Sequence, residues 1–230
     1  MIRHIAFIMD GNRRWAKKNG FATLYGHGKG VETIKSVITF CLKKNIENVS
    51  LYTFSIENFK RSDEEKSHLF SLILRQAKQE AVEQFLEQDI RVSFIGDRSL
   101  FPQEVTTACL NLEQKTAHCK ALRLNFLFCY GGRQEFTYGV KSIVQKIKNG
   151  LLSPESISDE VVQEHMWTAG IPDPDVIIRT GGFKRLSNFL LYQSAYSELF
   201  FLDCLWPELN EALLEKTYQE FLGRKRKFGT

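Results

Sequence analysis

Short apolar runs alternate with longer segments of helical period along the whole chain. The runs predict strands at His4–Met9, Asn48–Phe54, Ile90–Ile95, Leu122–Cys129, Asp175–Arg179 and Glu198–Phe201. The longer segments predict helices at Val31–Lys44, Asp63–Glu87, Pro102–His118, Arg133–Lys148, Ser158–Met166 and Asn210–Lys227. Strands that alternate with helices are typical of an α/β fold with a mostly parallel sheet and helices on both faces. We expect one domain spanning residues 1–230.

Composition supports this assignment and adds one anomaly. A chain of 230 residues with 43% hydrophobic and 25% charged residues is ordinary for a soluble domain that buries a core. The net charge of +4 is too small to indicate nucleic-acid binding, for which clustered cations would be needed. The chain contains 18 Phe, which either fill the core or line an apolar cavity for a hydrophobic ligand.

The chain shows no targeting segment, membrane span or cysteine framework. Its first apolar stretch, Ile5–Met9, is too short for a signal peptide, and no run approaches the ~20 apolar residues of a membrane span. The five cysteines are odd in number and form no CxxC pair, so neither disulfides nor zinc are indicated. We therefore expect a cytoplasmic protein.

Glycines and charged residues gather just beyond the predicted strands. In open α/β sheets, ligands bind outside the carboxyl ends of the strands, where glycines permit close backbone approach. The segments at these ends are Asp10-Gly11-Asn12, Ser55-Ile56-Glu57-Asn58, Gly96-Asp97-Arg98, Tyr130-Gly131-Gly132-Arg133 and Arg179-Thr180-Gly181-Gly182, and Arg14, Arg61 and Arg185 lie near them. The pattern favours a site for an anion.

The stretch after the first strand has two interpretations. Arg13 and Arg14 follow Asp10 within four residues. If a helix begins near Asn12, its free N–H groups and the Arg14 guanidinium suit a phosphate, and Mg²⁺ between the phosphate and Asp10 would remove their repulsion. In the alternative, Asp10 caps the helix and Arg14 is solvated. This stretch alone leaves both open.

The glycine-rich stretch Gly26–Gly30, "GHGKG", does not match a nucleotide motif. It lacks the spacing and the Ser/Thr of a P-loop, and it does not follow a strand closely. We expect a tight turn into the next helix. His27 is then either a surface or capping residue, or a donor to phosphate.

The segment Ile177–Phe201 carries a second group of donors. Arg179, Arg185 and Ser187 surround a Gly-Gly turn and suit a diphosphate. Glu198 begins an apolar strand, where an unpaired carboxylate is costly. It is either salt-bridged or a metal ligand.

Several stretches closely resemble the cis-prenyltransferases, specifically the bacterial undecaprenyl diphosphate synthases. They are "MDGNRRWAK", "LYTFSIENF" with a following Arg, "YGGR", "IIRTGG", "RLSNFLLYQSAYSELFF" and "LWP", in the family's order from His4 to Gly229. Such enzymes condense isopentenyl diphosphate repeatedly onto an allylic diphosphate, usually farnesyl diphosphate. The resemblance implies a six-stranded parallel sheet flanked by helices and enclosing a hydrophobic tunnel. It also implies Mg²⁺, a homodimer, and delivery of the product to a membrane that the protein contacts peripherally.

The resemblance also assigns roles to single positions. Asp10 would assist the metal and the departing diphosphate, and Glu198 would be the second metal carboxylate. Asn58 is assigned to the proton step; because an amide is a poor base, we expect it to position the group that takes the proton. The substrate-binding assignments are Gly11, Asn12, Arg13, Arg14, Trp15 and His27; Ser55, Ile56, Glu57, Phe59 and Arg61; and Arg179, Arg185, Leu186 and Ser187.

Some positions depart from the common bacterial pattern. Thr23 stands where an arginine usually contacts the allylic diphosphate, and Phe183 stands where an acidic residue is usual. Phe59 replaces a Trp, Ser62 a Pro, and Cys129 the Asn of an NYGGR motif. The charged and polar core of the site is complete, so we expect an active enzyme.

The sequence leaves the role of the basic tail open and allows two other classes of protein to be considered. The basic tail Arg224–Gly229 is either a solvated helix end or lies near the partner subunit's site. A non-catalytic partner subunit would be expected to lack Asp10 or the Asn58/Arg61 loop, and this chain has both. A doubly wound nucleotide-binding module would need a glycine-rich loop directly after the first strand, which "DGNRRW" is not.

Overall fold

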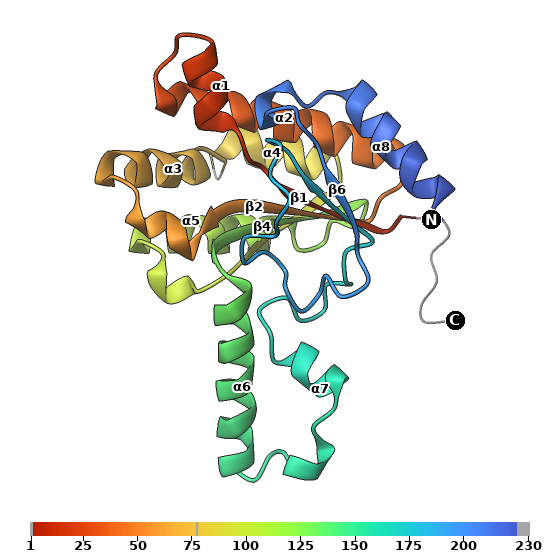
Figure 1. Ribbon diagram of the computed structural model, residues 1–230. Coiled ribbons are helices and arrows are strands. Elements are labelled where there is room, and N and C mark those ends of the chain that lie inside the picture. The colour runs from red at the N-terminus through yellow and green to blue at the C-terminus, as the bar shows by residue number, and fades with distance from the viewer. Residues whose placement is uncertain (1, 77, 225–230) are drawn as a thin grey trace.

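A single parallel sheet forms the centre of the molecule (Figure 1). The computed structural model describes residues 2–76 and 78–224. The sheet has six strands in the order β3-β4-β2-β1-β5-β6, and every neighbouring pair is parallel. The strands are β1 (His4–Ile8), β2 (Asn48–Ser55), β3 (Ile90–Ile95), β4 (Leu122–Tyr130), β5 (Val176–Arg179) and β6 (Glu198–Phe201). All six predicted strands are confirmed, with ends that differ by at most one residue.

Apart from α1, which the sequence left open, the helices depart from the predicted segments in two places, and the predicted end of the last helix at Lys227 lies outside the described residues. The helices are α1 (Asn12–Lys18), α2 (Thr23–Lys43), α3 (Asp63–Gln76), α4 (Gln79–Glu87), α5 (Gln103–Thr116), α6 (Gly132–Lys148), α7 (Asp159–Glu164) and α8 (Glu211–Gly223). The predicted single helix Asp63–Glu87 is two helices, because Lys78 at the start of α4 has an extended backbone. The second departure is at the start of α2.

The predicted glycine turn before the second helix is wrong, because Gly26 to Gly30 lie inside α2. A Cβ at Gly26 would meet the carbonyl oxygen of Asn12 at 2.2 Å, and one at Gly30 would meet Asn12 Oδ1 at 2.6 Å. These glycines let α2 pack directly against α1, and the helical conformation survives because the packing offsets their unfavourable helix propensity.

Helices cover one face of the sheet, and irregular chain covers the other. Side chains alternate along β1, so that Ile5 and Phe7 join the large core cluster shared with α2, α3, α4, α5 and α8. Ala6 and Ile8 join a smaller cluster with Phe189, Leu190 and neighbouring residues from outside the helices. Helices α6 and α7 instead project from the sheet as an arm (Figure 1). The expectation of helices on both faces therefore holds only for the first face.

Helix α5 also covers the free edge of the sheet. The backbone N–H of Val92 donates to Thr116 Oγ1 (3.0 Å), and that of Phe94 donates to Glu113 Oε1 (2.7 Å). Two side chains of α5 thus occupy donors that the edge strand β3 would otherwise leave open to another chain.

His4 is a buried, neutral residue of β1. Its Nδ1 lies 2.6 Å from the carbonyl oxygen of Pro172, which can only accept, so Nδ1 carries the proton. Its Nε2 therefore accepts from Ser50 Oγ, at 2.8 Å. Burial is the main cause that lowers the pKa of His4 from 6.5 to about 4.

We expect His4 to make the protein less stable in mild acid. Between pH 4 and 6.5 the unfolded chain binds a proton at this residue and the folded chain does not, so stability falls as the pH falls through this window. The full effect is about 3 kcal/mol in the free energy of unfolding. Urea unfolding at several pH values should show a flatter pH dependence for His4→Gln than for the wild type. Equal slopes would contradict the assignment.

Candidate active site

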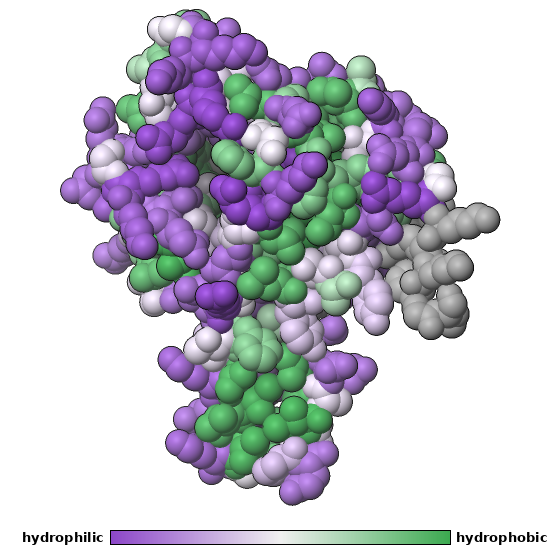
Figure 2. All heavy atoms as spheres, viewed as in Figure 1, coloured by the Kyte–Doolittle hydropathy of each residue, from purple (hydrophilic) through white to green (hydrophobic). Residues whose placement is uncertain are grey.

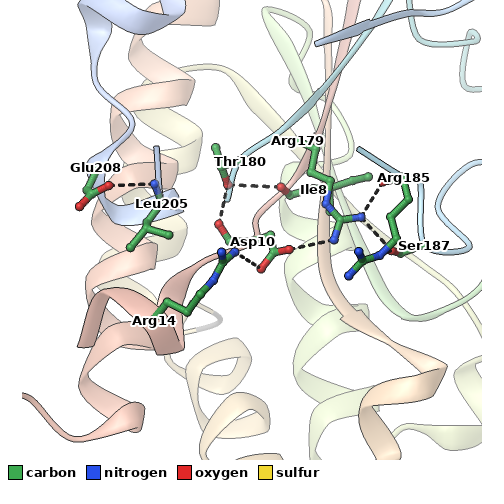
Figure 3. A network of polar contacts seen from close by, with 9 residues as sticks. All are labelled: Ile8, Asp10, Arg14, Arg179, Thr180, Arg185, Ser187, Leu205 and Glu208. Atoms are coloured by element: carbon green, nitrogen blue, oxygen red, sulfur yellow. Dashed lines mark hydrogen bonds and ion pairs between the residues drawn. The ribbon is translucent and has the colours of Figure 1, made fainter. Parts of the chain in front are cut away.

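The carboxyl ends of β1 and β5 bring Asp10 and Arg179 together (Figure 3). Asp10 follows β1 directly, and Arg179 is the last residue of β5. Arg179 Nη2 donates to Asp10 Oδ2 at 2.8 Å, and Arg14 Nη2 donates to Oδ1 at 3.2 Å. Asp10 is not a helix cap, because the cap position of α1 is Gly11 and no side chain caps that helix. The carboxylate instead lies between two guanidinium groups.

A loop after β5 adds two further donors to this cluster. Arg179 Nη1 donates to Ser187 Oγ (2.7 Å) and to the carbonyl oxygen of Arg185, and Arg185 Nε donates to Ser187 Oγ (3.1 Å). Only 4% of the Arg179 side chain is exposed, so its position is fixed by these contacts. The three side chains form a donor set suited to a diphosphate.

Phe183 is packed among the three arginines. The guanidinium carbons of Arg14, Arg179 and Arg185 lie 4.9, 5.9 and 4.4 Å from the centre of its ring. An aromatic face attracts cations without neutralising them. The residue that departs from the family's acidic pattern therefore holds the arginines while leaving their charge available to an anion.

The backbone around Asp10 is held from two sides. Thr180 Oγ1 donates to the Asp10 carbonyl oxygen at 2.7 Å, and the N–H of Trp206 donates to the same oxygen at 3.0 Å (Figure 3 shows the Thr180 contact). Gly11 has φ +122°, and a Cβ there would lie 2.9 Å from Leu205 Cα. Only glycine fits this turn, so the position of the carboxylate depends on the tertiary contact with residues 205–206.

Asn58 lies in the 3-10 turn after β2, Ile56–Lys60. Its Oδ1 accepts from the N–H of Ser55 at 3.0 Å, and the Ser55 side chain in return accepts from the N–H of Asn58. This reciprocal cap fixes the amide at the mouth of the cavity described below. Ser62, where the family usually has Pro, accepts from the N–H of Glu65 (3.3 Å) in the first turn of α3.

His27 is buried inside α2 and contacts a residue that sequence reasoning missed. A carboxylate can only accept, so His27 Nε2 carries a proton and donates to Glu65 Oε1 at 3.0 Å. Burial lowers the pKa of His27, and the hydrogen bond to Glu65 opposes this shift. Arg61 Nη1 also donates to Glu65 Oε1, at 3.0 Å. The i,i+4 spacing of Arg61 and Glu65 was the only sequence signal for this bridge.

One large cavity joins these groups to an apolar tunnel. It has a volume of about 810 Å³ and runs between the sheet and helices α2, α3 and α4. Its polar end contains Asp10, Gly11, Asn12, Arg13, Arg14, His27, Ser55, Asn58, Arg61, Arg179, Arg185 and Ser187. Its apolar walls include Ile34, Leu69, Ile73, Phe85 and Phe128. Several of the 18 Phe therefore line the cavity, while others, such as Phe7, pack in the core.

Other predicted site residues lie outside the lining of this cavity. Trp15 stacks on Phe21 at the surface, and Phe59 packs edge-on against Phe54 in the core. Glu57 accepts from Asn188 Nδ2 at 2.9 Å. Ile56 and Leu186 are half-buried beside the site. Among the departures, Thr23 does line the cavity, and Cys129 is buried with φ +49°.

Glu198, the predicted second metal carboxylate, lies away from Asp10 in the same chain. It pairs with Val176 at the amino end of β5, while Arg179 at the other end of that strand lies beside Asp10. Its carboxylate accepts from Arg224 Nη1 at 2.7 Å. Of the two roles predicted for Glu198, salt-bridge partner or metal ligand, the single chain shows the salt bridge.

The side chains at Asp10 suit a magnesium ion that arrives with a diphosphate. Mg²⁺ in such sites uses one or two carboxylates together with substrate phosphates, and Asp10 supplies one carboxylate beside Arg14 and Arg179. No group of three or more His, Cys, Asp or Glu residues that could hold a metal occurs within residues 2–76 and 78–224. Asn12 Oδ1 is buried on the cavity wall and has no hydrogen-bond partner. A metal held jointly by Asp10 and a bound diphosphate fits this set.

The fold thus places a cluster of guanidinium donors at one end of a long, largely apolar cavity. The family described as "Putative undecaprenyl diphosphate synthase" matches residues 8–229. An isoprenyl transferase of Clostridium perfringens is 41% identical over 100% of this chain and 90% of its own. The ditrans,polycis-undecaprenyl-diphosphate synthase of Photorhabdus laumondii, named as (2E,6E)-farnesyl-diphosphate specific, is 39% identical over 99% and 89%.

A solved structure shares the architecture. Lavandulyl diphosphate synthase from Lavandula x intermedia, in complex with dimethylallyl diphosphate, superposes with a TM-score of 0.96 at 31% identity, covering 100% of this chain and 98% of its own. The chain belongs to the undecaprenyl diphosphate synthase family of prenyltransferases. It is a transferase of isoprenyl groups with the fold that the resemblance implied.

We expect Phe183 to tune diphosphate affinity. Phe183→Leu removes the aromatic face from Arg14 and Arg185 and should raise the KM for a diphosphate substrate by about 2–5-fold, from ~0.5–1 kcal/mol of lost cation–π attraction. Phe183→Tyr keeps the face and serves as the matched control. Steady-state kinetics would contradict this role if the Leu and Tyr variants behaved alike.

Proposed function

We propose that this prenyltransferase elongates farnesyl diphosphate by repeated cis condensation with isopentenyl diphosphate. The product would be undecaprenyl diphosphate, the precursor of the lipid carrier for cell-wall synthesis. The observation that carries the proposal is the continuous cavity of about 810 Å³, which starts at the arginine cluster and continues between apolar helix faces. A diphosphate bound at the polar end would leave its hydrocarbon in the tunnel.

The donor clusters suggest where each substrate binds. Arg179, Arg185 and Ser187 would hold the isopentenyl diphosphate. Arg13, Arg14, His27 and the first N–H groups of α1 would hold the allylic diphosphate. Asp10 contacts Arg14 and Arg179 at once, so the two sites adjoin.

The residues of the site would favour the transition state over the ground state. Negative charge develops on the departing diphosphate as its C–O bond ionises, so guanidinium donors stabilise it increasingly. The bound Mg²⁺ would supply further charge stabilisation for this diphosphate. Arg14 and Arg179, once bound to phosphate, would release the Asp10 carboxylate for the metal.

Asn58 would act in the proton step as a positioning residue. Its amide oxygen already accepts from Ser55, which fixes the orientation of the side chain. The amide N–H₂ is then available to orient a diphosphate oxygen, which takes the proton that the carbon beside the carbocation loses as the new double bond forms.

The direct test is an assay of the purified protein with farnesyl diphosphate, labelled isopentenyl diphosphate and Mg²⁺. Incorporation of label that EDTA abolishes, with products of eleven isoprene units on chain-length analysis, is the expected result. Shorter or longer products would instead support a different cis-polyprenyl diphosphate synthase. No incorporation, with diphosphate binding retained, would support a non-catalytic partner subunit.

The tunnel wall should set product length. Ala81 lies on α4 and lines the cavity. Ala81→Trp narrows the tunnel at this point, so the growing chain should stop earlier and the product distribution should shift to shorter species. Ala81→Ser serves as the control of similar volume. Chain-length analysis that shows the wild-type distribution for Ala81→Trp would contradict this role.

We also propose a homodimer. Phe136, Val140 and Val144 recur every four residues on α6 and are 43–46% exposed, which makes one apolar stripe. Figure 2 shows hydrophobic residues gathered on this arm. An exposed stripe of this kind fits a second copy of the chain, and light scattering after size exclusion would test it.

We propose that the protein is cytoplasmic and that its product passes to a membrane. Across residues 2–76 and 78–224, no helix has both the length and the apolar character needed to cross a bilayer.

Glu198 would act as a metal ligand only after its contact with Arg224 is broken. Residues 225–229 of the basic tail lie outside the described residues, and its role remains a prediction.

A further inference from the structure

Three aromatic side chains form a cluster on the surface where α1 passes into α2. Trp15 stacks on Phe21 and on Tyr25 with ring centres 5.9 and 6.3 Å apart, and Phe21 and Tyr25 lie 4.5 Å from each other. Phe21 is 47% exposed and Tyr25 is 53% exposed. Neither Phe21 nor Tyr25 lines the cavity. The cluster therefore presents aromatic surface to the outside without a role in the tunnel.

The chain around the aromatic cluster is strongly basic. From Asn12 to Gly30 it carries five Lys and Arg residues and no Asp or Glu. Arg14, Lys18 and Lys29 pair with Asp10, Glu208 and Glu32, which leaves Arg13 and Lys17 as the cations nearest the cluster. Lys17 is exposed at the end of α1, and Arg13 is 61% exposed with Glu65 no nearer than 4.0 Å. Aromatic rings beside Lys and Arg are the combination that binds the boundary between headgroups and acyl chains of an anionic bilayer.

The aromatic cluster also lies beside the opening of the tunnel. Arg13, Lys17 and Thr23, from the same segment, line the polar end of the cavity. Figure 1 shows α1 and the loop that follows it as a projecting corner of the molecule. Contact with a flat surface through this corner would bring the cavity mouth close to that surface.

We propose that Trp15, Phe21 and Tyr25, with the neighbouring cations, dock the enzyme on an anionic phospholipid surface. Docking in this way sets the tunnel opening at the level of the headgroups, where a polyprenyl diphosphate can pass into the bilayer. The proposal rests on the proposed function in so far as the product is a membrane lipid. Binding of the protein to phospholipid vesicles tests the docking surface without any measurement of prenyl transfer.

The test is flotation of the purified full chain with phospholipid vesicles. One set contains phosphatidylcholine alone, and the other contains phosphatidylcholine mixed with phosphatidylglycerol. The wild type should float with the anionic vesicles and less with the neutral ones, and added salt should weaken its binding. Phe21→Ser with Tyr25→Ser should lower the partition coefficient roughly tenfold. Lys17→Gln should lower it about fivefold, since each cation near the surface contributes ~1 kcal/mol.

Matched controls separate docking from folding and from catalysis. Leu100→Ser with Leu110→Ser removes two side chains of comparable exposure, 39% and 43%, far along the chain, and should bind like the wild type. Thermal unfolding of the Lys17→Gln variant should match the wild type, which keeps the test valid if the double aromatic variant unfolds. The Phe21/Tyr25 variant should retain activity in detergent.

Either of two results would refute the docking proposal. In the first, the Lys17 variant and the Phe21/Tyr25 variant both bind anionic vesicles as strongly as the wild type does. In the second, the wild type binds neutral and anionic vesicles equally. Vesicle binding with the expected variant effects but no prenyl transfer would leave the docking surface in place and refute the proposed function.

Discussion

Asp10→Asn is expected to lower the turnover number by roughly 10²–10³-fold, comparable to the loss of a group that stabilises developing charge. The variant keeps an oxygen that can accept from Arg14 and Arg179, whose donors lie 3.2 and 2.8 Å from the carboxylate. It loses the negative charge with which Asp10 would hold a magnesium ion beside the departing diphosphate. The Mg²⁺ concentration needed for half-maximal rate should rise as well.

The fold provides the control for this experiment. Thr180 and Trp206 hold the Asp10 backbone rather than its carboxylate, so the variant should fold normally. Circular dichroism and thermal unfolding check this. Turnover within a few-fold of the wild type, with unchanged Mg²⁺ dependence, would exclude Asp10 from the reaction.

Arg179→Ala is expected to raise the KM for isopentenyl diphosphate about 10–150-fold, from ~1.5–3 kcal/mol per charge-assisted hydrogen bond. The loss has two parts. The guanidinium group that would donate to the diphosphate is removed. The loop at Ser187 also loses the 2.7 Å hydrogen bond that Arg179 of β5 donates to Ser187 Oγ. Because the Arg179 side chain is only 4% exposed, water cannot replace it easily.

Comparison with two other variants separates these parts. Arg179→Lys keeps the charge without the planar fork and should fall between wild type and Arg179→Ala. Arg185→Ala removes an exposed donor and should raise the same KM with less effect on thermal stability. Initial-rate kinetics with each substrate varied would show a larger rise in the KM for the allylic diphosphate if the two sites were exchanged.

The strands and the segments that bear the site were predictable because their signals are local. Each strand is a short run of apolar residues, which must be buried on both faces of a parallel sheet, so its ends differ from the prediction by no more than one residue. The motifs after β1, β2 and β5 follow from the rule that ligands lie at the carboxyl ends of strands. That rule predicted Asp10 and Arg179 at the same edge of the sheet, and the structure adds the contact between them.

Helix boundaries were less predictable where packing outweighs propensity. Gly26, Gly28 and Gly30 weaken a helix locally, yet α2 begins at Thr23 because Gly26 and Gly30 let it approach α1. The break before α4 falls where no Pro or Gly marks it, and residues on either side of it, such as Ile73 of α3 and Ala81 of α4, line the cavity.

The strands, the order of the motifs and the chemical types at the site follow from the sequence, since composition and short-range pattern encode these directly. Which of those residues meet depends on the tertiary structure. Strand order puts β1 beside β5, so Asp10 lies against Arg179, while Glu198 lies at the other end of the sheet with Arg224. The bridge from Glu65 to His27 and the packing of Phe183 on three arginines also join residues distant in sequence. Such contacts depend on how the layers of the fold pack, which no local pattern records.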